Sequence, residues 1–456
     1  MEPIKKVPFT KEMKKTHTIL IPTMLPIHFT ILGNVLENYG YKVKVLDNCG
    51  PGVIEQGLKN VHNDTCYPAQ LVIGQMIDAL EHSDLPLDKV ALLITQTGGG
   101  CRASNYIYLL RKALNKCGYG DIPVISASFM KSEQSGGFSL PVTMLLQALY
   151  GVLCGDLIMT LYNQCIPYEV HKGDSQKAVD DSVAMAQKLF CKKLLRWKAV
   201  SALMVKIIER FKQVERKKEN KIKVGIVGEI YVKYSPLGNN NLEEFLLSEG
   251  CEVVCPGLYD FLLYCTHNVV YDNDLYGVGK PVAMVLRHIN KFLRNRKTEM
   301  IHLIEQNSDF QPPCRFESTI ESAKGYIGQG VKMGEGWLLT AEMVELVQHY
   351  KVNNIVCTQP FGCLPNHICG KGVMRVIKEK NPQANIVAVD YDSSASKVNQ
   401  QNRIKLMLAN ARLLNQSTSA PASSDTKMSS QQSVQDAASQ QHAKEEKHLA
   451  AAVQNQ

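Results

Sequence analysis

The chain has 456 residues and a formal net charge of +8, with 45% hydrophobic and 21% charged residues. These proportions are ordinary for a soluble globular protein of two or three domains, and they exclude a collagen or a coiled coil. Charged, polar or proline residues interrupt every apolar stretch before about 18 residues, so no membrane span is predicted. No small-residue cleavage site follows the basic N-terminal segment, and we therefore expect a cytoplasmic protein with free thiols.

The pattern over residues 16–140 predicts a first α/β domain. Strands are predicted at 17–22, 42–47, 90–95 and 123–127, and helices at 29–40, 68–82 and 103–116. Apolar spacing of three and four residues defines these helices, and Gly40 follows the first of them as a C-cap would. Alternation of strands with helices predicts a parallel sheet covered on both faces.

The strand pattern fades over residues 141–220, where the apolar spacing predicts amphipathic helices. We expect this segment to be a helical connector that packs on the first α/β domain. A basic run from Arg210 to Lys223 ends it. Because no nucleic-acid motif accompanies the run, a solvated helix or linker is favoured over a nucleic-acid contact.

A second α/β domain is predicted over residues 221–415. Strands are expected at 222–228, 251–256, 353–359 and 385–392, and helices at 241–250, 371–380 and 399–414, with further helices of uncertain limits in 278–350. The two α/β domains could be distant structural copies. Large apolar residues almost vanish over 416–456, so this tail cannot offset the entropy of ordering and is predicted to be disordered.

Three of the 14 cysteines have a distinctive context. Cys66, Cys101 and Cys363 each lie at or next to a predicted helix start, and the last two follow a predicted strand. Ligands of open α/β sheets bind beyond the carboxyl ends of the strands. Helix N-termini carry partial positive charge, which lowers a thiol pKa and favours the thiolate that binds metals. The alternative is that these cysteines are small buried hydrophobes.

Glycines accompany two of these cysteines. Gly98, Gly99 and Gly100 precede Cys101, and Gly362 precedes Cys363. Backbone without side chains can approach a bulky cluster and donate N–H groups to its sulfurs. Thiolates suit zinc or iron–sulfur clusters, and the absence of a Cys-x-x-Cys pair disfavours a zinc ribbon. Three thiolates would leave one iron of a cubane open; Cys369 is a weaker candidate for a further ligand.

Other functional motifs are weak. The GGGC sequence is not a dinucleotide fingerprint, and Gly362–Gly372 has the wrong length for a P-loop, so ATP hydrolysis by this chain is not expected. The segment 229–241 follows a strand. It could contact a ligand through Glu229, Lys233 and Asn239, or be a polar connector.

Several long strings carry a family resemblance. They are NDTCYPAQLVIGQMIDAL, ITQTGGGCRASNYIYLLRKAL, KVGIVGEIYVKYSP, GEGWLLTAEM and CTQPFGCLPNHICGKG. The chain resembles, over most of 16–412, the acyl-CoA dehydratase activase-related proteins, which belong with the 2-hydroxyacyl-CoA dehydratase and benzoyl-CoA reductase subunits. The resemblance implies two Rossmann-like domains with an iron–sulfur cluster between them, held by Cys66, Cys101 and Cys363.

The resemblance also implies partners and chemistry. In the dehydratases a separate ATP-dependent activator injects a low-potential electron, and the cluster reduces an acyl-CoA substrate to a ketyl radical. A 4Fe-4S cluster is implied, although some relatives hold a double-cubane cluster, and so is a homodimer or heterodimer. The activator domains of longer relatives are absent here, so the activator would be another polypeptide. No nucleic-acid or membrane partner is expected.

Two other functions stay open. One is a non-catalytic iron–sulfur electron carrier or activase-associated partner. The other is a metal-free α/β module that binds a small molecule and has buried thiols.

Overall fold

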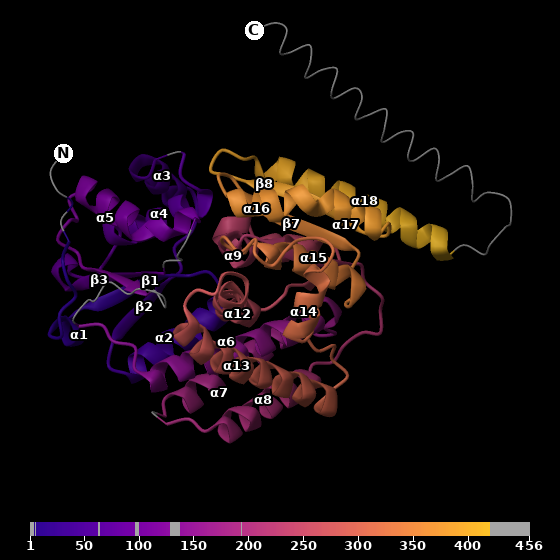
Figure 1. Ribbon diagram of the computed structural model, residues 1–456, viewed down its shortest axis with the longest axis horizontal. Coiled ribbons are helices and arrows are strands. Elements are labelled where there is room, and N and C mark those ends of the chain that lie inside the picture. Colours follow the sequence, from indigo (N-terminus) through magenta and orange to yellow (C-terminus); the bar gives the residue numbers. More distant parts are fainter. Residues whose placement is uncertain are drawn as a thin grey trace, which may run out of the picture. The chain divides into compact units, whose positions relative to one another are not determined.

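The computed structural model describes residues 4, 6–62, 64–95, 100–127, 137–192 and 194–419, with the backbone alone over 415–419. Residues Met1–Leu408 form one compact unit and Ala409–Gln456 another. The fold described below is that of the first unit (Figure 1). Most of the predicted tail, residues 420–456, lies outside the described residues.

The first sheet has four parallel strands in the order β2-β1-β3-β4. They are β1 (Thr18–Pro22), β2 (Lys42–Leu46), β3 (Val90–Thr95) and β4 (Val124–Ala127). All four were predicted to within about a residue or two. The central strand β3 is buried along most of its length because β-branched and leucine side chains face helices on both sides.

The helices of this half are α1 (Met13–Thr16), α2 (Pro26–Asn38), α3 (Pro51–Asn60), α4 (Tyr67–Glu81) and α5 (Tyr106–Lys116). Helix α3 was not predicted. It packs closely on α4, since a Cβ on Gly74 would lie 2.2 Å from the carbonyl oxygen of Val53. Glycine therefore allows this close backbone contact in the middle of α4.

A layer of helices follows, as predicted for residues 141–220. It consists of α6 (Val142–Cys165), α7 (Asp174–Phe190) and α8 (Trp197–Lys212). The layer packs on the first half, as expected, and it also packs on the second. Helix α6 contacts α2 of the first half and also α12 (Leu258–Tyr276) of the second, while α8 contacts α13 (Lys280–Asn307). The reason is that α6 is apolar around its circumference, so it is buried by neighbours on every side.

The segment Val142–Tyr168 is long and apolar enough to cross a membrane by length and composition. This qualifies the sequence-based expectation of no such span. However, 67% of its most apolar window is buried inside the structure, as in the core helix of a soluble protein. The buried Asp156 in its middle accepts hydrogen bonds from three partners, which fits a protein interior.

The second sheet repeats the first with the order β6-β5-β7-β8, again all parallel. Its strands are β5 (Lys223–Gly228), β6 (Glu252–Val254), β7 (Asn354–Pro360) and β8 (Asn385–Tyr391). Further helices are α9 (Ile230–Tyr234), α10 (Pro236–Asn239), α11 (Leu242–Ser248), α14 (Phe316–Ala323), α15 (Trp337–Gln348), α16 (Leu364–Cys369), α17 (Met374–Lys380) and α18 (Lys397–Ser419). Helix α18 continues past the predicted boundary at 415.

The fold is therefore mixed α/β, with two Rossmann-like parallel sheets of identical strand order. One apolar core joins the halves: it includes Ile31 of α2, Leu157 of α6, Tyr259 of α12 and Leu293 of α13. The domain boundaries at 140 and 220 stay predictions. The matching strand orders agree with the idea that the two α/β regions are structural copies.

Candidate metal centre

All three candidate cysteines occupy the same local position, the residue before a helix. Cys66 precedes α4, Cys101 precedes a 3-10 turn (Arg102–Asn105) that leads into α5, and Cys363 precedes α16. Each has an extended backbone, and none uses its sulfur as a helix cap. A proline follows Cys66 and Cys363 near the start of α4 and α16, and a 3-10 turn follows Cys101.

Contacts between loops bring these cysteines together. The loop after β7 packs on the start of α4, because Tyr67 N–H donates to the carbonyl oxygen of Phe361 at 3.1 Å. An ideal Cβ on Gly362 would lie 3.2 Å from the Cα of Cys66. Gly334 lies close to Cys101 and to the start of α16: its ideal Cβ would lie 3.9 Å from Cys101 Sγ and 3.0 Å from a ring carbon of Pro365.

The charge of one cysteine thiolate also affects the pKa of another. Burial chiefly raises the pKa of the Cys101 thiol, and the charge of Cys66 contributes to that rise. Burial likewise raises the pKa of Cys363, with Cys101 among the charges that add to it. Cys101 therefore interacts electrostatically with both Cys66 and Cys363.

The glycines have unequal roles in this arrangement. Gly362 has φ +73°, a conformation that favours glycine, and its missing side chain leaves room for Cys66 and Arg102. The N–H of Gly100 points to Met333 Sδ at 3.1 Å, and an ideal Cβ there would meet only this flexible side chain. Gly98 and Gly99 lie outside the described residues.

The expected lowering of the thiol pKa values by helix N-termini is wrong for these cysteines. Burial raises the pKa of Cys101 to about 11 and also raises the pKa of Cys66 and Cys363. Desolvation outweighs the helix N-terminus because it penalises the thiolate directly. At neutral pH the metal-free thiols are protonated, so a metal must displace their protons on binding.

Two carboxyl groups, the half-buried Glu229 and the buried Glu335, lie in the same region. Glu229 accepts a hydrogen bond from Val232 N–H at 2.9 Å, and Glu335 accepts one from Ile230 N–H at 3.0 Å. Burial raises the pKa of Glu229 to about 8, with the charge of Glu335 adding to the rise, and burial also raises the pKa of Glu335. Both carboxyl groups add to the rise in the pKa of Cys101 and Cys363.

Sequence reasoning considered Glu229 but missed Glu335. The available signal was GEGW, in which Glu335 stands between two glycines before an apolar helix. Those glycines have φ +59° and +43°, so the chain turns sharply there and carries Glu335 to the start of α9. Nothing in the local pattern shows that this loop meets Cys101, since 234 positions separate Cys101 and Glu335 along the chain.

Both predictions for residues 229–241, a ligand loop and a polar connector, need correction. The segment forms α9 and α10, and most of it is buried. Lys233 is paired with Glu342 at 2.9 Å, and the Asn239 amide donates to the carbonyl oxygen of Val232 at 3.0 Å. Lys233 and Asn239 therefore have structural partners, and only Glu229 faces the thiols' surroundings.

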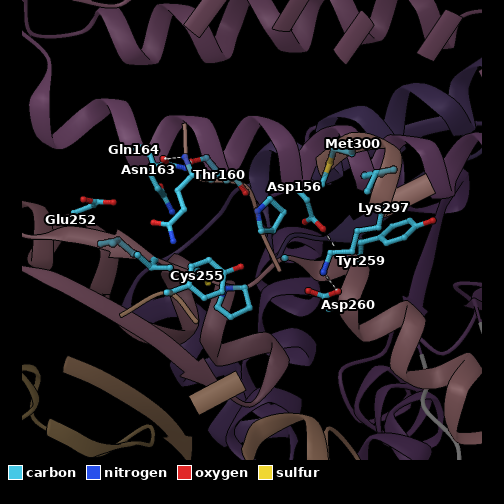
Figure 2. Close-up of a pocket in the computed structure, with 18 residues that line it drawn as sticks. Asp156, Thr160, Asn163, Gln164, Glu252, Cys255, Tyr259, Asp260, Lys297 and Met300 are labelled. Carbon is cyan, nitrogen blue, oxygen red and sulfur yellow. Dashed lines mark hydrogen bonds and ion pairs between the residues drawn. The ribbon is translucent and has the colours of Figure 1, made fainter. Parts of the chain in front are cut away.

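A cavity lies elsewhere, between α6, the end of β6 and α12 (Figure 2). Figure 2 shows Asp156 and Asn163 on one side of it and Cys255 opposite, with the Lys297–Asp260 ion pair at one end. Its volume of about 50 Å³ suits a few water molecules. None of Cys66, Cys101 and Cys363 lines it, so we do not assign the chemistry to it.

The basic run that ends the helical layer is largely neutralised. Arg210 pairs with Asp181, Arg216 with Asp309, and Lys223 with Glu252. Such pairing fits the solvated surface that the sequence favoured.

The donor set suits an iron–sulfur cluster better than one metal ion. Within the described ranges, no three His, Cys, Asp or Glu residues are grouped to hold a single ion. A cubane binds each thiolate through a different iron, so its ligands surround a volume instead of meeting at a point. Cys66, Cys101 and Cys363 supply soft sulfur donors of the kind that such a cluster uses.

No family model matches this chain, and no curated protein is significantly similar to it. The resemblance carried by its motifs therefore stays a prediction.

Proposed function

We propose that this chain is an iron–sulfur protein similar to 2-hydroxyacyl-CoA dehydratase subunits. It would receive low-potential electrons from a separate ATP-dependent activator and use them in reductive or radical chemistry on an acyl-CoA-type substrate. One observation supports the proposal: the loop that carries Cys363 contacts the start of α4 at Cys66, and Gly334 lies close to both Cys101 Sγ and Pro365 of α16. A 4Fe-4S cluster is the cofactor that this donor set favours.

Each part of the site has a distinct role in this proposal. The three cysteines would hold the cluster, which supplies low-potential one-electron chemistry when bound. Gly362 leaves the space that a side chain would fill. Burial raises the pKa of both Glu229 and Glu335, so these carboxyl groups are candidates to hold a proton near the proposed cluster.

A soluble, cytoplasmic protein fits this function. A reducing compartment keeps thiols free for iron, and the most apolar helix is mostly buried inside the fold. Pairing with a second subunit is part of the proposal, as the resemblance implies.

Anaerobic reconstitution with iron and sulfide tests the proposal. We expect bound iron and sulfide, a broad absorbance at about 400 nm and a paramagnetic signal after reduction, because thiolates ligate such clusters. Cys66→Ser, Cys101→Ser and Cys363→Ser should each lose most of the absorbance. Cys191→Ser, at an exposed position, is the matched control and should keep it. A wild-type chain that stays colourless and iron-free would refute the proposal.

The raised thiol pKa values favour one alternative, a metal-free α/β module that binds a small molecule. In that case the three serine variants would lose only modest stability and no chromophore. A non-catalytic electron carrier would bind the cluster but would not turn over any acyl-CoA with a reduced activator present.

A further inference from the structure

The sulfur of Cys66 has a side-chain partner that the other two candidate ligands lack. The hydroxyl of Tyr106 lies 3.1 Å from Cys66 Sγ. Within the described parts of the chain, no side-chain hydrogen bond reaches the sulfur of Cys101 or Cys363. The three sulfurs are therefore inequivalent before any metal binds.

The placement of Tyr106 links two segments of the centre. It is the first residue of α5, directly after the turn that Cys101 begins. Cys66 belongs to the start of α4, which packs against α5. The segment that supplies one candidate ligand thus also supplies a hydroxyl group to another.

Resting on the proposed function, we infer that Tyr106 is a positioning residue that sets the reduction potential of the cluster through Cys66. A metal-bound thiolate has no proton, so the tyrosine O–H must be the donor. A hydrogen bond to a charged acceptor is stronger than a neutral one. It stabilises the reduced cluster more than the oxidised one, because reduction adds negative charge to the sulfurs, and it therefore raises the potential.

A purely structural role for Tyr106 makes a different prediction. Tyr106→Phe keeps the ring and its packing and removes only the hydroxyl group. If the ring alone matters, the variant has the wild-type potential. Tyr108→Phe is the matched control, because Tyr108 lies on the same helix with 51% of its surface exposed.

The experiment is a redox titration of the full-length reconstituted protein, followed by electron paramagnetic resonance. Wild type, Tyr106→Phe and Tyr108→Phe are first compared for iron and sulfide content, which we expect to be equal. The potential of Tyr106→Phe should then be lower. At the wild-type midpoint, its reduced fraction should fall severalfold, whereas Tyr108→Phe should match wild type.

Two results would overturn the inference, and they are distinguishable. A loaded Tyr106→Phe variant with an unchanged or higher potential refutes the role of Tyr106 and leaves the proposed function intact. A wild-type chain that binds no cluster refutes both.

Discussion

In the first half of the chain, the segment after β3 provides Cys101 and the start of α4 provides Cys66. In the second half, the segment after β7 provides Cys363, but the start of α15 provides Glu335. Helices α4 and α15 correspond, since each packs on the first strand of its sheet, β1 or β5, and leads to the third. One structural plan thus supplies two thiols from one half and a thiol and a carboxyl group from the other.

This difference accounts for the number of thiols. A fully symmetric pair of halves would supply four cysteines, enough to ligate every iron of a cubane. Glu335 lies two residues before α15, close to the position that Cys66 has before α4, and its carboxyl group accepts the N–H of Ile230. If the proposed cluster binds, this asymmetry would leave one of its irons without a cysteine ligand.

The halves also differ in the buried basic side chain that follows the first strand of each sheet, β1 or β5. In α2 this base is His28, which lies 2.8 Å from Asp156; in α9 it is Lys233, paired with Glu342. Lys233→Met should destabilise the fold by about 3–5 kcal/mol, because it leaves a buried carboxylate without its partner. Urea unfolding measures the loss.

The double variant Lys233→Met with Glu342→Leu is the control and should recover most of this stability, since it removes both charges. His28→Leu should cost less than Lys233→Met, because Asp156 keeps the N–H groups of Leu258 and Tyr259 as donors. An equal or larger loss in His28→Leu would contradict the comparison.

Buried acids of the second half should make stability depend on pH. Burial raises the pKa of Glu345 to about 8 in the folded chain, well above its ordinary value. The folded state then binds a proton that the unfolded state has released, so this stability is present at low pH and is lost as pH rises from about 4.5 to 8.

Glu345→Gln removes this titrating group. The fall in the free energy of unfolding with rising pH should then be less steep by up to about 1.4 kcal/mol per pH unit. Denaturant midpoints between pH 5 and 8 measure the slope. Glu317→Gln, at an exposed position on α14, is the control and should leave the slope unchanged. Parallel curves for Glu345→Gln and wild type would contradict the prediction.

Corresponding glycines should respond unequally. Gly362→Ala places a Cβ 3.2 Å from the Cys66 backbone at a positive φ, so it should cost about 1–3 kcal/mol and reduce cluster loading. Gly100→Ala meets only the flexible Met333 side chain and should be tolerated. Thermal unfolding measures the stability of each variant, and iron content measures its cluster loading. Equal losses of stability in Gly362→Ala and Gly100→Ala would contradict the prediction.

A substitution at Glu335 tests whether the two halves correspond at this position. Glu335→Cys places a thiol where a symmetric site would have one. We expect iron content to stay the same and added cyanide to perturb the paramagnetic signal less than in wild type, because the open iron gains a ligand. Glu335→Gln, which adds no thiol, should keep the wild-type response.

The sequence predicted the sheets well because buried parallel strands and their glycine or polar ends have strong local patterns. It also singled out Cys66, Cys101 and Cys363 through their places before helices. It missed α3, whose packing depends on Gly74, and α9, whose charged Lys233 has a distant partner. It missed Glu335 because the meeting of that loop with Cys101 is a long-range contact.

Asp156 of α6 accepts hydrogen bonds from Leu258 and Tyr259 at the start of α12 and lies beside His28 of α2. The buried Asp156 side chain therefore links α2 of the first half and α12 of the second half to α6. Hinged opening of the molecule would have to break this tie and expose the common apolar core. Chemical denaturation of this unit should therefore proceed in one step.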